Sequence, residues 1–303
     1  MVLPLRPHVT ASLRCIIVLA LAAGCARGTT TAPHPVTQSF SGFDTAIYPG
    51  DDKMRAWVKP NSPYHWVGYY LPAPCHRDAS WAGKRETLVA MGWGLAVLYV
   101  GQQTWEGVPE RAARADTVAP RADTTQLAAV QRSITCSRTL LSAAQGTAEA
   151  DDAVAKASAD GFPAGTHIFL DVERMTAIPE SMRDYYRAWV TRVLTDARFR
   201  PGIYAHQRNA QEIYADVRAL FDAAGVRDEP AFWVSSPSTL SPTSTPTDLG
   251  FRFARVWQAV IDARQTWNDV TLRVDVNVAD SPSPSTPGSA LATAGQKAPA
   301  RAP

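Results

Sequence analysis

The chain has 303 residues, of which 46% are hydrophobic and 19% are charged. It therefore has enough apolar material to bury a core and does not have the composition of a disordered protein. Its 30 basic and 28 acidic residues leave a formal charge of only +2, which argues against nucleic-acid binding, because that function needs clustered excess Lys and Arg.

The first 24 residues, 1–24, have the pattern of a secretory signal. Basic residues without acidic ones precede a short apolar run at residues 15–23, and this run is too short for a membrane span of about 20 residues. Residues 21–25 (LAAGC) resemble a bacterial lipobox, with Ala22 where a lipobox usually has Leu. We therefore expect an extracytoplasmic protein anchored to the membrane through a lipid on Cys25, or a plain secreted protein if the lipobox is not used.

Two cysteines, Cys75 and Cys136, remain in the mature domain, because Cys15 would leave with the signal and Cys25 would carry the lipid. An even pair in an oxidising compartment can form a disulfide. Two unpaired thiols are an equal alternative, since the sequence does not place the cysteines within bonding distance. The six His are scattered and no CxxC or HExxH spacing occurs, so the sequence indicates no metal and no cofactor.

Polar segments flank a patterned core at residues 41–280. Residues 25–40 are rich in Thr and Pro and predict a flexible tether. Residues 281–303 are rich in Pro, Ser and Ala and predict a disordered tail. The core between them has the length of one α/β barrel, about 250 residues.

Eight short apolar runs in the core are typical of parallel strands that are buried on both faces. They lie at residues 42–48, 65–71, 94–101, 166–173, 202–206, 231–235, 254–260 and 274–279. Helical segments separate most of them, at residues 51–58, 84–91, 125–144, 151–159, 181–197 and 209–224. This alternation predicts a single TIM-like (β/α)8 barrel of the α/β class. Residues 102–138 predict an elaborated loop after the third strand, and the Pro/Ser/Thr-rich residues 236–250 indicate that the last helices are degenerate.

Acidic residues end several predicted strands, where the active site of such a barrel forms. Asp171 and Glu173 are two apart on one strand, so both should point the same way. Their repulsion should raise one pKa, which keeps a carboxyl group protonated as a general acid. Asp44 and Asp275, on the first and last strands, should flank each other where the barrel closes. Solvated strand ends with capping acids are the alternative without chemistry.

Aromatic and amide side chains near the same strand ends predict a carbohydrate-binding cleft. Sugar rings stack on aromatic side chains, while their hydroxyls bond to carboxylates and amides. The alternative for each aromatic residue is a place in the core. The predicted substrate-binding residues are Tyr48, Tyr99, Tyr204, Trp233, Trp257, Gln258 and Asn277.

The motifs in this core, in order, resemble a known family. They are GFDTAIYPGDDKMRAW, WVGYYL, GLAVLYVGQQ, PAGTHIFLDVE, YYRAWV, RPGIYA, FWVSS, VWQ and VDVN. They resemble the bacterial glycoside-hydrolase-like domain of unknown function 1906, which is similar to a mycobacterial exported protein and, more distantly, to the family 25 lysozymes. The resemblance implies a TIM-barrel-like fold and an acidic cluster at Asp44, Asp171, Glu173 and Asp275. The long segment at residues 102–138 and the pair Cys75 and Cys136 depart from the family pattern.

The residues and the resemblance together favour an exported, lysozyme-like or muramidase-like glycoside hydrolase that acts on cell-wall glycan such as peptidoglycan. By analogy with family 25, Glu173 would donate the proton to the glycosidic oxygen. Asp171 would stabilise positive charge or orient an N-acetyl group, and Asp44 and Asp275 would position and tune them. The alternatives are a catalytically silent glycan-binding barrel and a structural envelope lipoprotein that uses the same cleft.

Overall fold

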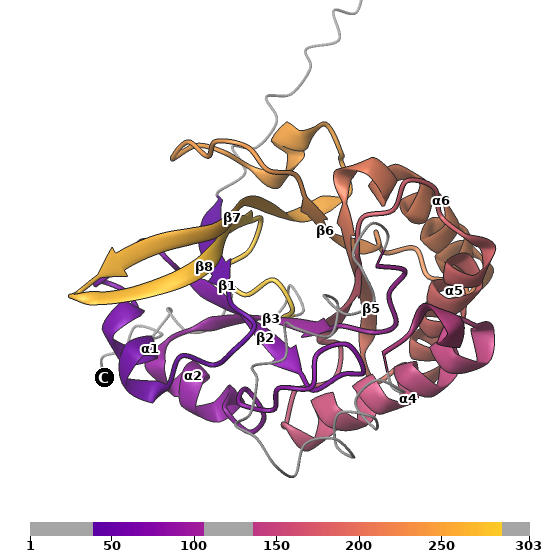
Figure 1. Ribbon diagram of the computed structural model, residues 1–303, viewed down its shortest axis with the longest axis horizontal. Coiled ribbons are helices and arrows are strands. Elements are labelled where there is room, and N and C mark those ends of the chain that lie inside the picture. The colour runs from indigo at the N-terminus through magenta and orange to yellow at the C-terminus, as the bar shows by residue number, and fades with distance from the viewer. Residues whose placement is uncertain (1–38, 106–135, 287–303) are drawn as a thin grey trace, which may run out of the picture. The chain divides into compact units, whose positions relative to one another are not determined.

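The computed structural model describes residues 39–105 and 136–286 (Figure 1). Eight strands close into a barrel in chain order, with β8 returning to β1. The strands are β1 (Phe40–Asp44), β2 (Trp66–Leu71), β3 (Gly94–Tyr99), β4 (His167–Val172), β5 (Arg200–His206), β6 (Ala231–Ser235), β7 (Ala254–Trp267) and β8 (Val270–Ala279). The helices are α1 (Asp51–Trp57), α2 (Arg85–Met91), α4 (Ala143–Ala159), α5 (Glu180–Asp196) and α6 (Gln207–Ala223). The prediction of a single TIM-like barrel is confirmed.

The last part of the barrel departs from strict strand–helix alternation. Strands β1 to β7 pair in parallel, whereas β8 is antiparallel to both β7 and β1. A long β7–β8 hairpin therefore closes the barrel without an intervening helix. Residues 236–250, predicted to lack a regular helix, contain only the short 3₁₀ helix η2 (Pro246–Leu249).

The helix predicted at residues 125–144 lies mostly outside the described residues. In its described part, residues 138–140 form the 3₁₀ helix η1 (Arg138–Leu140). Helix α4 then begins at Ala143, because the Ser142 hydroxyl accepts a hydrogen bond from the Gln145 backbone N–H at 3.2 Å. The helix predicted at residues 151–159 is therefore the second half of a longer one.

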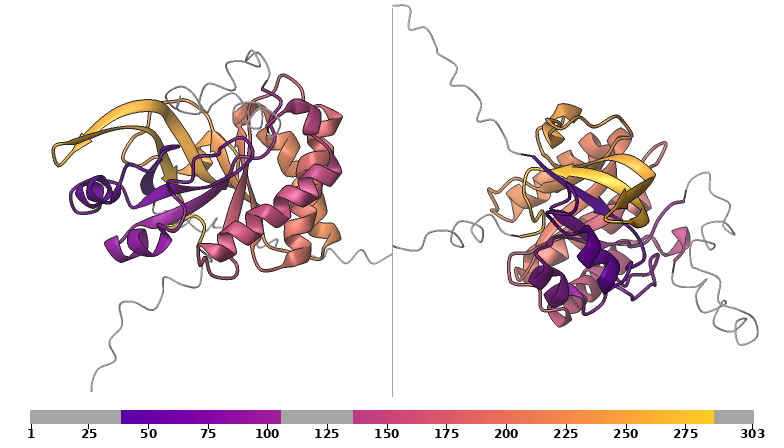
Figure 2. Two further views of the ribbon diagram at one scale, coloured as in Figure 1. Left: turned by 60° about the horizontal axis from the view of Figure 1, so that its bottom comes forward. Right: turned by 90° about the vertical axis from the view of Figure 1, so that its left-hand side faces the viewer.

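Alternate residues of the strands face two different cores. The outer core joins the barrel to the helices, and α4, α5 and α6 lie together along one flank (Figure 1). The β7–β8 hairpin extends past the barrel beside α1 (Figure 2), where the Trp57 indole N–H donates to the Val270 carbonyl at 3.0 Å. The inner core fills the barrel with large and small residues, namely Trp66, Ala96, Leu98, Phe169, Ala231, Trp233, Val256 and Ala279.

Residues 281–286 make specific hydrogen bonds to the barrel, contrary to the prediction of a tail disordered from Ser281. The Val97 backbone N–H donates to Ser285 Oγ at 2.7 Å, and the His167 backbone N–H donates to the Ser285 carbonyl at 2.8 Å. Residues 281–286 thus lie across the N-terminal ends of β3 and β4, where these strands have not yet paired. The composition of this segment predicts disorder, because it does not show that unpaired backbone N–H groups of β3 and β4 are available to bond to its serines.

The predicted signal at residues 1–24, the tether up to Gln38, Cys25 and residues 287–303 lie outside the described residues. In the part of the chain that the structure describes, no helix has both the length and the hydrophobicity to cross a bilayer.

Candidate active site

Four acidic residues meet at the C-terminal end of the parallel strands, and we call Asp44, Asp171, Glu173 and Asp275 the acidic cluster. Asp44 ends β1, Asp171 and Glu173 lie at the end of β4, and Asp275 lies on β8. Asp44 and Asp275 are direct partners in the β1–β8 register, as the closure of the barrel predicts. Each member of the cluster has its pKa raised by burial.

Three polar side chains hold Asp44, which is 3% exposed. The Tyr70 hydroxyl donates to Oδ1 at 2.7 Å, while Asn277 Nδ2 and Gln258 Nε2 donate to Oδ2 at 2.8 and 3.2 Å. Burial raises the pKa of Asp44 and these hydrogen bonds oppose the rise. The Asp44 side chain packs on Gly68, where an added Cβ would lie only 2.5 Å from the Asp44 Cβ.

Asp275 is held by a side chain and by a strand irregularity. Gln258 Nε2 donates to Asp275 Oδ2 at 3.0 Å. The β7–β8 register shifts between Val260 and Ala263, and the Asp262 backbone N–H there donates to Asp275 Oδ1 at 2.6 Å. Asp262 has a φ of 55°. Burial and then repulsion from Asp44 raise the pKa of Asp275 to about 7, so this carboxyl group is partly protonated near neutrality.

Burial is the first cause of the raised pKa values of Asp171 and Glu173, and charge repulsion adds to it. Burial, then the charges of Glu173 and Asp44, raise the pKa of Asp171 well above its usual range. Asp171 Oδ1 is buried without a hydrogen-bond partner, which makes an ionised carboxylate costly there. Burial also raises the pKa of Glu173, against a backbone hydrogen bond from Arg174 and with further repulsion from Asp275. The pair can therefore present protonated carboxyl groups, which is what general acid catalysis needs.

Beneath the acidic cluster, Trp233 and Asn277 form a fully buried floor. The Trp233 indole N–H donates to Asn277 Oδ1 at 3.0 Å, so the same amide that donates to Asp44 is oriented from below. Tyr204 packs edge-on to Trp233 and its hydroxyl donates to Gln258 Oε1 at 2.7 Å. The structure therefore brings Gln258, Asn277, Tyr204 and Trp233 to the cluster, but Trp233 supports it rather than facing a ligand.

The structure places three of the predicted substrate-binding aromatic residues away from the acidic cluster. Tyr99 is on the helix side of β3 and donates to Asp152 Oδ2 at 2.7 Å. The Trp257 indole N–H donates to the Ser236 carbonyl at 2.8 Å, outside the barrel. The Tyr48 hydroxyl donates to Asp51 Oδ1 at 2.7 Å, at the start of α1. For Tyr99 and Trp257 the reason is that strand periodicity separates the two faces of a strand but does not tell which face is inside. Tyr48 lies beyond the end of β1.

Two residues beside the acidic cluster, Tyr70 and Gln103, were not predicted from the sequence. Tyr70 has the same strand parity as Trp66 and Gly68, which both lie on the inner face, and that parity is the signal that could have found it. Gln103 follows β3 and is fully buried. Its Nε2 donates to the Asp171 carbonyl at 2.8 Å and its Oε1 accepts from the Glu173 backbone N–H at 3.1 Å.

Cys75 and Cys136 form a disulfide with a Cα–Cα distance of 4.9 Å, which settles the two alternatives that the sequence left open. The Cys75 backbone N–H donates to the Val100 carbonyl at 3.1 Å, just beyond β3. The disulfide therefore attaches the far end of the segment at residues 102–138 to the end of the barrel that carries the acidic cluster.

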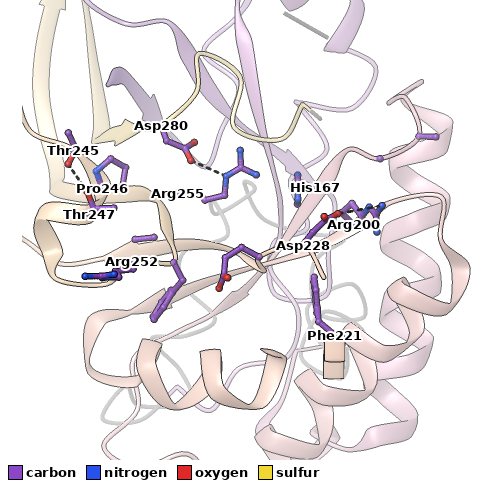
Figure 3. Close-up of a pocket in the computed structure, with 15 residues that line it drawn as sticks. His167, Arg200, Phe221, Asp228, Thr245, Pro246, Thr247, Arg252, Arg255 and Asp280 are labelled. Carbon is purple, nitrogen blue, oxygen red and sulfur yellow. Dashed lines mark hydrogen bonds and ion pairs between the residues drawn. The ribbon is translucent and has the colours of Figure 1, made fainter. Parts of the chain in front are cut away.

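A separate cavity of about 680 Å³ lies at the opposite, N-terminal end of the strands (Figure 3). Two of its three arginines are paired with acids: Arg255 lies 3.2 Å from Asp280 and Arg200 lies 3.9 Å from Asp228. Burial and these arginines lower the pKa of His167, also in its wall, to about 3. No member of the acidic cluster lines this cavity. Among residues 39–105 and 136–286, no three His, Cys, Asp or Glu side chains are arranged to hold a metal ion.

Solved structures resemble this chain. An uncharacterised B. stearothermophilus protein is 18% identical over 79% of this chain and 95% of its own, with a TM-score of 0.47. The Mycobacterium tuberculosis Tat-secreted protein Rv2525c, in complex with L-tartrate, is 16% identical over 80% and 94%, with a TM-score of 0.43. A family GH25 lysozyme from Aspergillus fumigatus is 11% identical over 80% and 94%, also at 0.43.

Among proteins with curated functions, none matches the chain. The model of the Rv2525c-like, glycoside hydrolase-like domain matches residues 55–279. This range includes Asp171, Glu173 and Asp275, and it confirms the resemblance drawn from the motifs. The chain belongs to the family of Rv2525c-like, glycoside hydrolase-like domains.

Proposed function

We propose that the chain is an exported enzyme that hydrolyses glycosidic bonds in cell-wall glycan such as peptidoglycan, with Glu173 as the proton donor. The observation that carries the proposal is the acidic cluster, in which burial and mutual repulsion raise carboxyl pKa values at the C-terminal end of the barrel. Glycoside hydrolysis uses one protonated and one ionised carboxyl group. Membership of a glycoside hydrolase-like family supports the same reaction class.

The environments of the carboxyl groups suggest different roles. Glu173 is only half-buried and directly follows its strand, so it can reach the glycosidic oxygen and transfer its proton there as the C–O bond breaks. Asp171 is deeper and its ionisation is disfavoured, so it orients a sugar substituent such as an N-acetyl group by hydrogen bonding. Asp275, with a pKa of about 7, is partly ionised near neutrality. It faces the cationic transition state and accepts a proton from the attacking water.

Glu173→Gln tests the proposed acid. The amide keeps the size of the side chain but has no proton to transfer, so release of reducing ends from purified peptidoglycan should fall by about 10²–10⁴-fold while glycan affinity is largely kept. Glu180→Gln is the matched control, because Glu180 is an exposed acid at the start of α5, the helix that follows Glu173 in the chain. It should keep wild-type turnover.

A wild-type protein that binds glycan but releases no reducing ends from about pH 4 to about pH 8 would refute the catalytic proposal. The glycan-binding barrel would then stand.

Export and lipid attachment at Cys25 are part of the same proposal, because the substrate lies outside the cytoplasm. Their support is the basic start, the apolar run and the LAAGC ending in the sequence. A fatty-acid analogue supplied to cells should label the wild type and not Cys25→Ser. Equal labelling of the two would exclude the anchor, and a protein found in the medium would support plain secretion.

A further inference from the structure

The pairing between β3 and β4 ends before the two acids Asp171 and Glu173. These strands share three residue pairs, the last being Tyr99 with Leu170, whereas β4 and β5 share six and continue to Val172 with Ala205. On the β3 side, the backbone of residues 171–173 therefore has no strand neighbour. An unpaired buried backbone group costs about as much as a lost hydrogen bond, so something else must bond there.

The side chain of Gln103 takes this place. Its amide donates to the Asp171 carbonyl at 2.8 Å and accepts from the Glu173 N–H at 3.1 Å. In a parallel ladder, one strand residue likewise bonds to the two residues that flank its partner. A glutamine amide has the same donor and acceptor as a peptide group, and only one orientation of the Gln103 amide satisfies both partners.

We propose that Gln103 is the positioning residue of the candidate active site, because its side-chain amide extends the β3–β4 ladder by one step and holds Asp171 and Glu173 on the same face. This inference rests on the proposed function for the roles of the two acids. Gln103 touches their backbone groups and acts on the reaction only through them. Without it, Glu173 would be free to rotate away, since it already lies beyond the last residue of β4.

The neighbouring residue Gln102 provides a matched control. Both glutamines are fully buried, but Gln102 points to the helix layer. Its Nε2 donates to Glu149 Oε1 at 2.8 Å and its Oε1 accepts from the Ser137 backbone N–H at 2.8 Å. Gln102→Met and Gln103→Met therefore remove the same chemical group from adjacent buried positions, with only the second affecting the acids.

Two readouts test the inference in the full chain. The first is the pH profile of kcat/KM for release of reducing ends from peptidoglycan. The second is ¹³C NMR titration of the Glu173 carboxyl group, assigned with Glu173→Gln, which needs no turnover. In Gln103→Met, kcat/KM should fall by about 10²-fold, as for a small misplacement of a reacting group. The alkaline limb and the Glu173 pKa should both move down, toward the ordinary value of about 4.3, because Glu173 becomes more exposed.

Gln102→Met should keep the wild-type alkaline limb and the wild-type Glu173 titration, even if it loses as much stability. Equal titrations of Glu173 in the wild type, Gln102→Met and Gln103→Met would overturn the positioning role. A wild type without turnover would refute the proposed function, and the NMR comparison would still decide the role of Gln103.

If Gln103→Met does not fold, Gln103→Glu replaces it. The new carboxyl group can donate to the Asp171 carbonyl only when it is protonated, so the Glu173 signal should match the wild type at low pH and depart from it as the new group ionises. A match at every pH would overturn the inference.

Discussion

Asp275 provides a direct test of the electrostatics of the acidic cluster. Burial and the charge of Asp44 raise its pKa from 3.8 to about 7 in the folded protein, whereas an Asp in an unfolded chain titrates near about 3.9. Because the folded-state pKa is the higher one, the stability that Asp275 contributes is fully present below about pH 4 and is lost as the pH rises through about 7. Above that pH, the folded protein must hold a buried negative charge.

Asp275→Asn imitates the protonated carboxyl group at every pH. The amide keeps one acceptor oxygen for the Asp262 backbone N–H, whereas its NH2 group faces Gln258 Nε2, which donates to the carboxylate, and this loss is the same at every pH. The change in the free energy of unfolding should therefore be more favourable at about pH 8.5 than at about pH 4. The difference between 3.8 and about 7 corresponds to at most about 4 kcal/mol, and solvent screening of this partly exposed group reduces it to about 2 kcal/mol.

Urea-induced unfolding at the two pH values measures the effect. Asp262→Asn is the control on the same hairpin, because Arg273 lowers the pKa of Asp262. The stability from that ion pair is present above the unfolded-state pKa and lost at low pH, so Asp262→Asn should destabilise the protein more at about pH 8.5 than at about pH 4. If Asp275→Asn destabilises the protein equally at both pH values, the raised pKa is wrong.

Two further predictions concern the scaffold. Denatured, non-reduced protein should show no titratable thiol from Cys75 or Cys136. Replacing both by Ser should lower the free energy of unfolding by about 4 kcal/mol in the chain-entropy model for a separation of 61 residues; two free thiols would disprove the bond. Gly68→Ala should lower the free energy of unfolding by about 1–3 kcal/mol and weaken glycan binding, because the new Cβ would meet Asp44. Gly202→Ala is the control: its new Cβ would meet Phe169, so it should lower stability without weakening glycan binding. Equal loss of glycan binding in the two variants would count against a local effect on Asp44.

The barrel and its four acids were predictable because they depend on patterns that strands impose. Buried parallel strands read as apolar runs, and the end of such a run marks the end of the barrel where Asp171 and Glu173 lie. Spacing by two residues placed both acids on one face, and barrel closure paired Asp44 with Asp275. Each of these inferences needs only the order of strands and their period.

The aromatic residues were harder because spacing does not set which strand face is inside. Tyr69 and Tyr70 are adjacent, yet Tyr69 bonds to Asp160 near the helices while Tyr70 bonds to Asp44 inside the barrel. The same ambiguity applies to Trp257 and Gln258, which are also adjacent: Trp257 faces outward and Gln258 faces the barrel interior. A shift by one residue exchanges the two faces of a strand, so the register with neighbouring strands is required to choose.

The seam between β3 and β4 shows why contacts from outside the strands were the least predictable. At the N-terminal end of these strands, the backbone N–H groups of Leu95 and Val97 donate to the hydroxyls of Ser283 and Ser285. These two serines belong to a segment whose composition predicts disorder. At the C-terminal end of the strands, the Gln103 side chain takes the place of the missing strand residue. At both ends, polar side chains satisfy backbone groups that a short ladder leaves open. Because the Gln103 side chain satisfies the backbone groups beside Glu173, β3 does not have to continue at this point. The chain can therefore leave the barrel wall next to Asp171 and Glu173, which Gln103 helps to hold.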